Sequence, residues 1–249
     1  MSDLICFQDV AIVYKSKKTV VQVTEALNIR LRLNDFTCIL GPSGCGKTTL
    51  LNVIAGLQLP LNGKVVIGSS LVDKSNPKIS YVFQGHNIFP WKTVRQNIAF
   101  GLGDSKVNAE MSSRINTLAS EMGLSEYLDS YPGTLSGGLR QRVGVARAFI
   151  GNPDILLMDE PFASLDELTA YRLRILLRNL HKEMPTTIVF VTHNIDESIE
   201  LGDRILVTSR KPMQILIDKR IKKGLSMDAE SKFKLKSDIY KALQFDKNE

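Results

Sequence analysis

The sequence is poor in cysteine and has no long apolar run. The three cysteines Cys6, Cys38 and Cys45 show neither the even number of a disulfide framework nor the spacing of metal ligands. We therefore expect a protein of a reducing compartment. No apolar run is long enough to cross a bilayer, so we expect that the chain does not itself span a membrane.

The sequence also lacks a strong charge of either sign. A net charge of +6 over 249 residues is mild, and it indicates no particular anionic partner. Hydrophobic residues make up 43% and charged residues 23%, which are globular proportions and argue against disorder. The length suits one large α/β domain or two small ones.

What the sequence does contain is an alternation of strand-like and helical segments. The apolar runs at 154–159 and 186–192 are typical of parallel strands buried on both faces. Residues 4–14 and 20–33 favour antiparallel strands, and a helical block of about 85–150 interrupts the α/β core. A further helix is expected near 228–243. Together these patterns predict an α/β protein with a mixed sheet.

A glycine-rich segment, "GPSGCGKT", stands between an apolar strand and a helix, and it fits the phosphate-binding pattern G-x-x-x-x-G-K-[ST]. Its glycines allow backbone N–H groups to curl around phosphate oxygens. Lys47 is expected to reach the β- and γ-phosphates, and Thr48 to hold Mg²⁺. The expected nucleotide contacts are Gly41, Pro42, Ser43, Gly44, Cys45, Gly46, Lys47, Thr48 and Thr49.

Polar residues follow three more apolar strands. Asp159 ends the strand in "ILLMDEP" and is expected to hold Mg²⁺ through water, while Glu160 is placed to polarise an attacking water. Gln84 follows "ISYVF", and His193 follows "TTIVFVT". Open α/β sheets bind ligands at the carboxyl ends of their strands. These residues are therefore candidates for one site.

A second anion-binding signal lies about ninety residues after the first. Ser136, Gly137 and Gly138 open a helix in "TLSGGLRQRVGVARA". A helix N-terminus offers unpaired N–H groups and the positive end of the helix dipole to a phosphate. The chain therefore has two candidate phosphate-binding segments, which we call cradles, the glycine-rich segment at 41–48 and the helix start at Ser136. This raises the question of which nucleotide the second one binds.

The ordered motifs "GPSGCGKTTLLNVIAGL", Phe83-Gln84, "LSGGLRQRV", "LLMDEP", "SLD" at 164–166 and "VTH" at 191–193 resemble the ATP-binding subunit of an ABC transporter over roughly residues 4–217. The sequences "FPWKTVRQNIAFGL" and "VTHNIDESIELGDRILV" are most similar to those of the nitrate/sulfonate/taurine importer group. The resemblance implies a P-loop NTPase core with an N-terminal antiparallel β subdomain and an inserted helical subdomain. It also implies an ATPase domain at 1–217 and a C-terminal extension at 218–249.

The resemblance also answers the question of the second cradle. In this family two copies pair head to tail, and each ATP lies between the P-loop of one and the Leu-Ser-Gly-Gly segment of the other. Ser136, Gly137 and Gly138 are then expected to serve the partner's nucleotide. Tyr14 is expected to stack on adenine, with a core position at a strand end as its alternative, and Asp166 to link the two sites across the dimer.

The remaining roles implied by the resemblance concern hydrolysis and the membrane partner. Glu160 is the expected general base, His193 contacts the γ-phosphate, and Gln84 binds Mg²⁺ and water while it reports movement of the permease. The segment 87–95, with Phe89 and Trp91, is expected near the permease, although Trp91 could equally pack inside the helical block.

The resemblance implies a peripheral protein on the cytoplasmic face of the inner membrane, which works with an integral permease and indirectly with an extracytoplasmic solute-binding protein. No nucleic-acid partner is expected. The alternative is a soluble ABC ATPase that acts on nucleic acid or ribosomes. Because Cys45 lies within the glycine-rich segment, we also expect a bulky thiol reagent to block nucleotide binding. Asn194 stands where the family frequently has Asp, with no predicted effect.

Overall fold

The computed structural model describes residues 3–15, 20–76, 78–85, 87–103, 108–221 and 227–245. The chain divides into two compact units. The first unit combines Met1–Pro77 with Thr187–Glu249, and the second is Lys78–Thr186. Within the described ranges, no helix is both long enough and apolar enough to cross a membrane.

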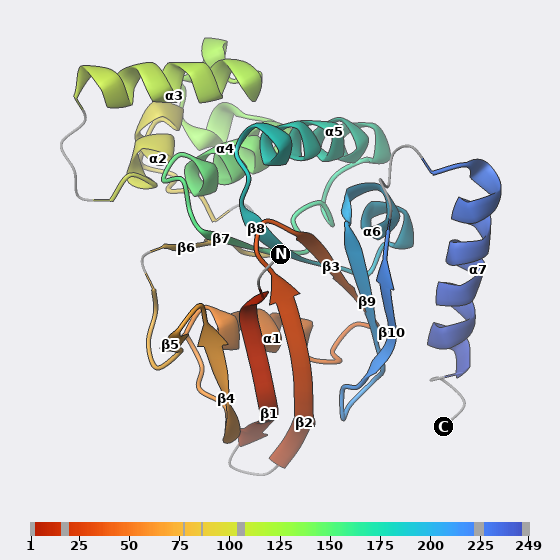
Figure 1. Ribbon diagram of the computed structural model, residues 1–249. Helices are drawn as coiled ribbons and strands as arrows, with labels where there is room; N and C mark the ends of the chain where they lie inside the picture. Colours follow the sequence, from red (N-terminus) through yellow and green to blue (C-terminus); the bar gives the residue numbers. More distant parts are fainter. Residues whose placement is uncertain are drawn as a thin grey trace. The chain divides into compact units, whose positions relative to one another are not determined.

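The first unit holds an antiparallel sheet near the N-terminus, in which the long strands β1 and β2 run side by side (Figure 1). Its strand order is β2-β1-β4-β5. The strands are β1 (Asp3–Lys15), β2 (Val20–Arg32), β4 (Asn62–Ile67) and β5 (Ser70–Leu71). The expected antiparallel strands are confirmed.

The same unit holds a second group of strands in the order β10-β9-β3-β8. Strand β3 is parallel to both β8 and β9, and β10 is antiparallel to β9. Every residue of β3 and β8 is buried, which explains why both are continuous apolar runs. The strands are β3 (Phe36–Leu40), β8 (Thr187–Thr192), β9 (Arg204–Thr208) and β10 (Ile215–Arg220).

Helices cover part of the first unit, among them three in its described residues. Helix α1 (Lys47–Ile54) packs against β8, and α6 (Ile195–Leu201) follows β8 along the chain. Helix α7 (Ala229–Phe245) lies near the C-terminus and contacts α6, β9 and β10 (Figure 1). The helix expected near 228–243 is present.

The second unit contains a parallel strand pair, β6 (Ile79–Val82) and β7 (Ile155–Asp159), together with most of the helices. Helix α2 packs on α3 and on α4, and α4 also contacts β6 and α5. The helices are α2 (Val94–Phe100), α3 (Ala109–Glu121), α4 (Gly137–Phe149) and α5 (Glu167–Glu183). The mixed α/β architecture and the helical insertion expected from the sequence are confirmed. The domain limits at 217 and 218 stay a prediction.

Candidate functional site

The glycine-rich segment 41–48 connects β3 to α1 in the first unit. Gly44 and Gly46 have φ angles of 78° and 117°, in the left-handed region that glycine adopts without strain. A Cβ on Gly41 would lie 2.1 Å from Thr208 Oγ1, so β9 approaches the start of the loop too closely for any larger residue. Left-handed residues in a loop that leads into a helix are typical of a backbone anion site.

Lys47 supplies a positive charge directly at this loop. Its side chain is buried, and its Nζ donates to the carbonyl oxygens of Gly41 at 2.8 Å and Pro42 at 2.9 Å. The ammonium group is therefore held against the loop by the loop's own backbone. Thr48 is exposed in the first turn of α1, where its hydroxyl is open to a ligand.

Tyr14, in β1, reaches the beginning of the same helix. Its hydroxyl accepts a hydrogen bond from Thr49 Oγ1 at 3.2 Å, and 45% of the residue is exposed. The ring is therefore fixed beside the loop while much of it faces solvent. This favours a stacking surface over the alternative of a core tyrosine.

The thiol of Cys45 is buried behind the loop, where the Nζ of Lys47 lies 3.9 Å from its Sγ. Cys45 is 2% exposed, and its Sγ lies 3.4 Å from Thr208 Oγ1 in a buried contact. This burial argues against the expectation that a bulky thiol reagent reaches Cys45 in the native protein, and labelling of the native protein tests it. Gly44 and Gly46, on either side of Cys45, have left-handed φ angles, and the Cys45 side chain packs against Thr208 of β9.

His193 leaves the strand next to the one that leads into the loop. Leu40 of β3 is the register partner of Thr192 of β8, and the two strands are parallel. The loop after Leu40 and His193 after Thr192 therefore emerge at the same edge, and the His193 side chain is exposed. Tyr14, the glycine-rich loop and His193 are thus brought together in the first unit.

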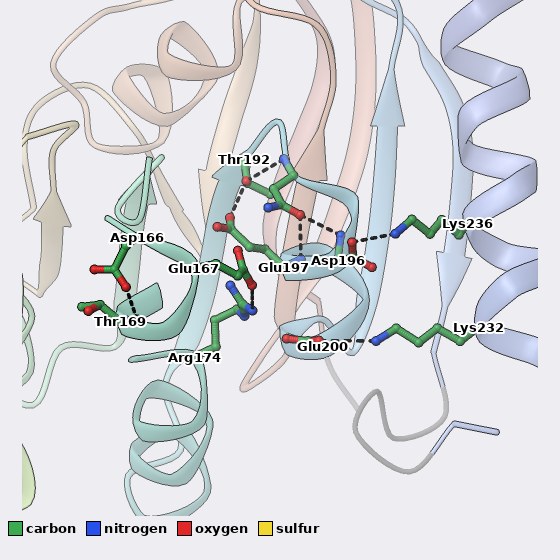
Figure 2. A network of polar contacts seen from close by, with 11 residues as sticks. Asp166, Glu167, Thr169, Arg174, Thr192, Asp196, Glu197, Glu200, Lys232 and Lys236 are labelled. Carbon is green, nitrogen blue, oxygen red and sulfur yellow. Dashed lines mark hydrogen bonds and ion pairs between the residues drawn. The ribbon is translucent and has the colours of Figure 1, made fainter. Parts of the chain in front are cut away.

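The turn that carries His193 is tightly hydrogen-bonded. Asn194 caps α6, because its Oδ1 accepts from the N–H groups of Asp196 at 2.9 Å and Glu197 at 3.2 Å. Thr192 Oγ1 accepts from Asn194 N at 3.0 Å and donates to Glu197 Oε2 at 2.6 Å (Figure 2). Asn and Asp are both good capping residues, which accounts for Asn at this position. The sequence pattern had given Thr192 and Glu197 no role.

The second unit places three polar residues at the ends of two paired strands. Asp159 is the last residue of β7, Glu160 comes directly after it, and Gln84 follows β6. Val82 of β6 is the register partner of Met158 of β7, so residues just beyond them lie at the same edge. Asp159 is buried at the end of β7, and Gln84 is exposed. Glu160 has a φ of 43°, an uncommon value for a residue other than glycine. Such strain costs of order 1–3 kcal/mol and clusters at functional sites.

The Ser136 segment forms a helix start open to an anion. Ser136 caps α4, and its Oγ accepts from Leu139 N at 3.3 Å, which leaves the hydroxyl hydrogen free to be donated. Ser136 is exposed, and the first turn of α4 contains no acidic residue. The charge and the donors of this helix start therefore suit a phosphate oxygen.

Gly138 and Asp166 lie at neighbouring helix starts in the second unit. A Cβ on Gly138 would lie 2.6 Å from Thr169 Cγ2, in the first turns of α5. Asp166 caps α5 by accepting a hydrogen bond from Thr169 N at 3.0 Å (Figure 2). Hydrogen bonds from the backbone and the side chain of Thr169 lower the pKa of Asp166. Asp166 is therefore an exposed carboxylate beside the Ser136 segment.

No cluster of three or more His, Cys, Asp or Glu residues forms a ready metal site in the part of the chain that the structure describes. The sequence had instead assigned the metal to Thr48, Gln84 and Asp159. These are a hydroxyl, an amide and a carboxylate, the hard oxygen donors that Mg²⁺ prefers. Each of the three side chains is, by its chemistry, a suitable Mg²⁺ ligand, and Mg²⁺ usually takes its other ligands from water and phosphate.

Comparison with known proteins agrees with this set of features. The family model described as ABC transporter matches residues 24–163. The chain is 38% identical over 235 residues to an aliphatic sulfonates import ATP-binding protein from Bacillus cereus, with 93% of each chain covered. It is 42% identical over 203 residues to a protein of the same name from Bacillus thuringiensis, with 81% and 80% covered.

A solved structure also matches along nearly its whole length. It is a dimeric, post-hydrolysis state of an ATP-binding cassette bound to ADP and Pi, with a TM-score of 0.77 and 29% identity, covering 88% of this chain and 99% of that one. The resemblance seen in the sequence motifs, including the importer group, is confirmed. The chain belongs to the ABC transporter family, among its ATP-binding subunits that hydrolyse ATP.

Proposed function

We propose that two copies of this chain drive an ABC importer, in which ATP binding and hydrolysis power the passage of a small, anionic solute through a separate membrane permease. The observation that carries the proposal is the match to import ATP-binding proteins over 93% of the chain, together with a preserved P-loop and Ser136 helix start. The similar cassette of known structure is a dimer.

Within the site, the first unit binds the nucleotide. Backbone N–H groups of 41–49 surround the phosphates, Lys47 reaches the β- and γ-phosphates, and Tyr14 stacks on adenine. His193, at the same edge, contacts the γ-phosphate. The His193 residue is exposed at this edge.

The second unit supplies hydrolysis and the contacts to the partner's nucleotide. Glu160 accepts a proton from the attacking water, and Gln84 orients that water. Gln84 and Asp159 of this unit are proposed ligands of Mg²⁺, which neutralises phosphate charge when bound, and Thr48 of the first unit is the third proposed ligand. Ser136, Gly137 and Gly138 bind the γ-phosphate held by the other copy, and Asp166 links the two sites.

The permease contact is proposed at the aromatic cluster of Phe89, Trp91 and Phe100. The Phe89 ring centroid lies 5.5 Å from that of Trp91 and 4.7 Å, edge-on, from that of Phe100. Trp91 is 69% exposed, which supports a surface contact over packing inside the helical block. Arg147 holds the cluster, because its guanidinium lies 5.2 Å from the Phe89 centroid and donates to the Asn87 carbonyl at 2.8 Å.

The chain would therefore sit at the cytoplasmic face of the inner membrane, and a solute-binding protein outside the membrane would deliver the solute. We further propose an ATPase domain at 1–217 with the helical insertion at 85–150, and an extension at 218–249 that carries α7. The soluble alternative is less favoured. Those that act on DNA insert long coiled coils between the two halves of the nucleotide site, whereas positions 47 and 159 here are only 112 apart. Those that act in translation carry two cassettes in one chain, whereas this sequence carries one set of the motifs.

Capture of the tagged chain from solubilised membranes tests this function. We expect a membrane protein with several spans to be recovered with it, and the recovery to fall when Trp91 is replaced by alanine. Phe233→Ala is the matched control, because Phe233 is a 75% exposed aromatic residue far along the chain on α7. Recovery of nucleic acid or ribosomes in place of a membrane protein would support the alternative.

A further inference from the structure

The C-terminal helix α7 is firmly attached to α6. Leu235 and Ile239, four residues apart and so on one face of α7, are 8% and 0% exposed. That helix contacts α6, β9 and β10. The charged residues Lys234, Asp238 and Lys241 of the same helix are exposed. Helix α7 is thus an amphipathic helix that buries its apolar face on the first unit.

Two ion pairs join α7 to both ends of α6. Lys236 Nζ lies 2.6 Å from Asp196 Oδ2, and Lys232 Nζ lies 3.3 Å from Glu200 Oε1 (Figure 2). The two lysines and the two acids are each four residues apart, so both pairs lie along one line of contact. The hydrogen bond to Asp196 raises the pKa of Lys236, which keeps its charge in place.

The first of these pairs includes Asp196, which is hydrogen-bonded to the turn that carries His193. Asp196 N donates to Asn194 Oδ1, and Asn194 N donates to Thr192 Oγ1. His193 therefore stands between two residues that are bonded to each other and to the start of α6. Any shift of Asp196 moves the cap, and the cap is the residue that follows His193.

We propose that α7 is a positioning element for His193, and that Lys236 exerts this effect through Asp196. The proposal rests on the function assigned to His193 above. Exposed ion pairs contribute little to stability, about 0–1 kcal/mol at the median, so folding alone does not require this one. A catalytic group, by contrast, is sensitive to small displacements, and a shift of about 1 Å can cost a hundredfold in rate.

The test compares Lys236→Met with the parent chain in ATP hydrolysis and in amide hydrogen exchange. We expect kcat to fall about threefold or more and KM to change much less, because His193 makes one contact to the γ-phosphate while the P-loop makes the other phosphate contacts. We also expect faster exchange in the peptide that contains 192–197, and unchanged exchange in the peptide that contains 41–48. Lys236→Arg should restore both values.

Lys234→Met is the matched control, since Lys234 is an exposed lysine on the same helix, and we expect it to behave as the parent. Asp196→Asn is the second variant, which removes the pair from the other side and should reproduce the fall in kcat if Lys236→Met fails to fold. An unchanged kcat, or a lower kcat without faster exchange at 192–197, would overturn the positioning role. A parent chain that does not hydrolyse ATP would instead count against the proposed function. The hydrogen-exchange comparison would still test whether α7 holds the turn at 192–197 in place.

Discussion

Thr169 and Gly138 lie so close together that a side chain on Gly138 would force Thr169 to shift. The Thr169 Cγ2 atom lies 2.6 Å from the point that a Cβ on Gly138 would occupy. Gly138 also belongs to the segment proposed to bind the partner's phosphate. Glycine at this position therefore serves the packing of α4 on α5 within one chain, in addition to any role toward a nucleotide.

This contact predicts how substitutions at the two positions combine. Gly138→Ala should lose about 1–3 kcal/mol to the clash and regain about 1 kcal/mol of helix propensity. Thr169→Ser removes the methyl group that clashes, so Gly138→Ala should be less harmful in that background. Denaturant unfolding of the four proteins measures the coupling. If Gly138→Ala lowers the free energy of unfolding equally in both backgrounds, the Thr169 methyl group is not the source of its cost.

Glu160 is expected to separate ATP binding from hydrolysis. The Glu160→Gln chain cannot accept the proton of the attacking water, yet it keeps the size of the side chain at a position with a φ of 43°. We predict nearly complete loss of ATP hydrolysis, unchanged nucleotide affinity and a stable dimer in the presence of ATP. Size-exclusion chromatography with and without ATP reports the dimer. Hydrolysis near the parent rate would remove Glu160 from the role of general base.

The three cysteines should differ in reactivity. Cys38 and Cys45 are buried, whereas Cys6 is only partly covered. A maleimide reagent should therefore label Cys6 first in the native protein, and Cys45 only after unfolding, because a buried thiol is not accessible. Peptide mass mapping of the labelled chain identifies the sites. Rapid labelling of Cys45 that ATP prevents would instead restore the expectation drawn from the sequence.

The ion pair between Arg204 and Asp218 predicts a pH dependence of stability. Arg204 donates to both Asp218 carboxylate oxygens, at 2.7 and 2.6 Å, and this lowers the pKa of Asp218. A lowered pKa in the folded state stabilises the protein above the unfolded pKa of about 3.9, and this gain disappears as the pH falls through the folded value.

Asp218→Asn should therefore cost about 0.5–1 kcal/mol at pH 7, a modest value because the Asp218 side chain is 48% exposed. The difference from the parent chain should shrink below about pH 4. Urea unfolding at several pH values measures it, with the exposed Asp73→Asn as the control. A difference that stays constant down to pH 3 would mean that the carboxylate charge is not its source.

The sequence predicted the elements whose burial pattern is uniform. Strands β3 and β8 are buried at every residue, so each reads as an uninterrupted apolar run, and the residues after them could be placed at one sheet edge. The start of α4 was likewise visible, because Ser136 is a good capping residue followed by two glycines. In both cases the signal lies within a few neighbouring residues.

Features that depend on contacts between distant segments could not be predicted in this way. The direction of the Cys45 side chain depends on Thr208, 163 residues later, and on the left-handed glycines beside it. The packing need for Gly138 arises from Thr169. The pairing of Lys236 with Asp196 joins two helices whose sequences, taken singly, show only charged surface positions.

The central claim is that one copy holds only part of a working site, since the Ser136 helix start serves the nucleotide of a second copy. ATPase activity per molecule, measured over a wide range of protein concentration alongside the mass of the species in solution, tests it most directly. We predict that activity per molecule rises with the dimer fraction and vanishes in dilute monomer. Mixing Ser136→Arg chains with Lys47→Ala chains, each inactive alone, should recover activity from one complete site. A demonstrably monomeric chain that hydrolyses ATP as fast per molecule as the concentrated protein would contradict the account.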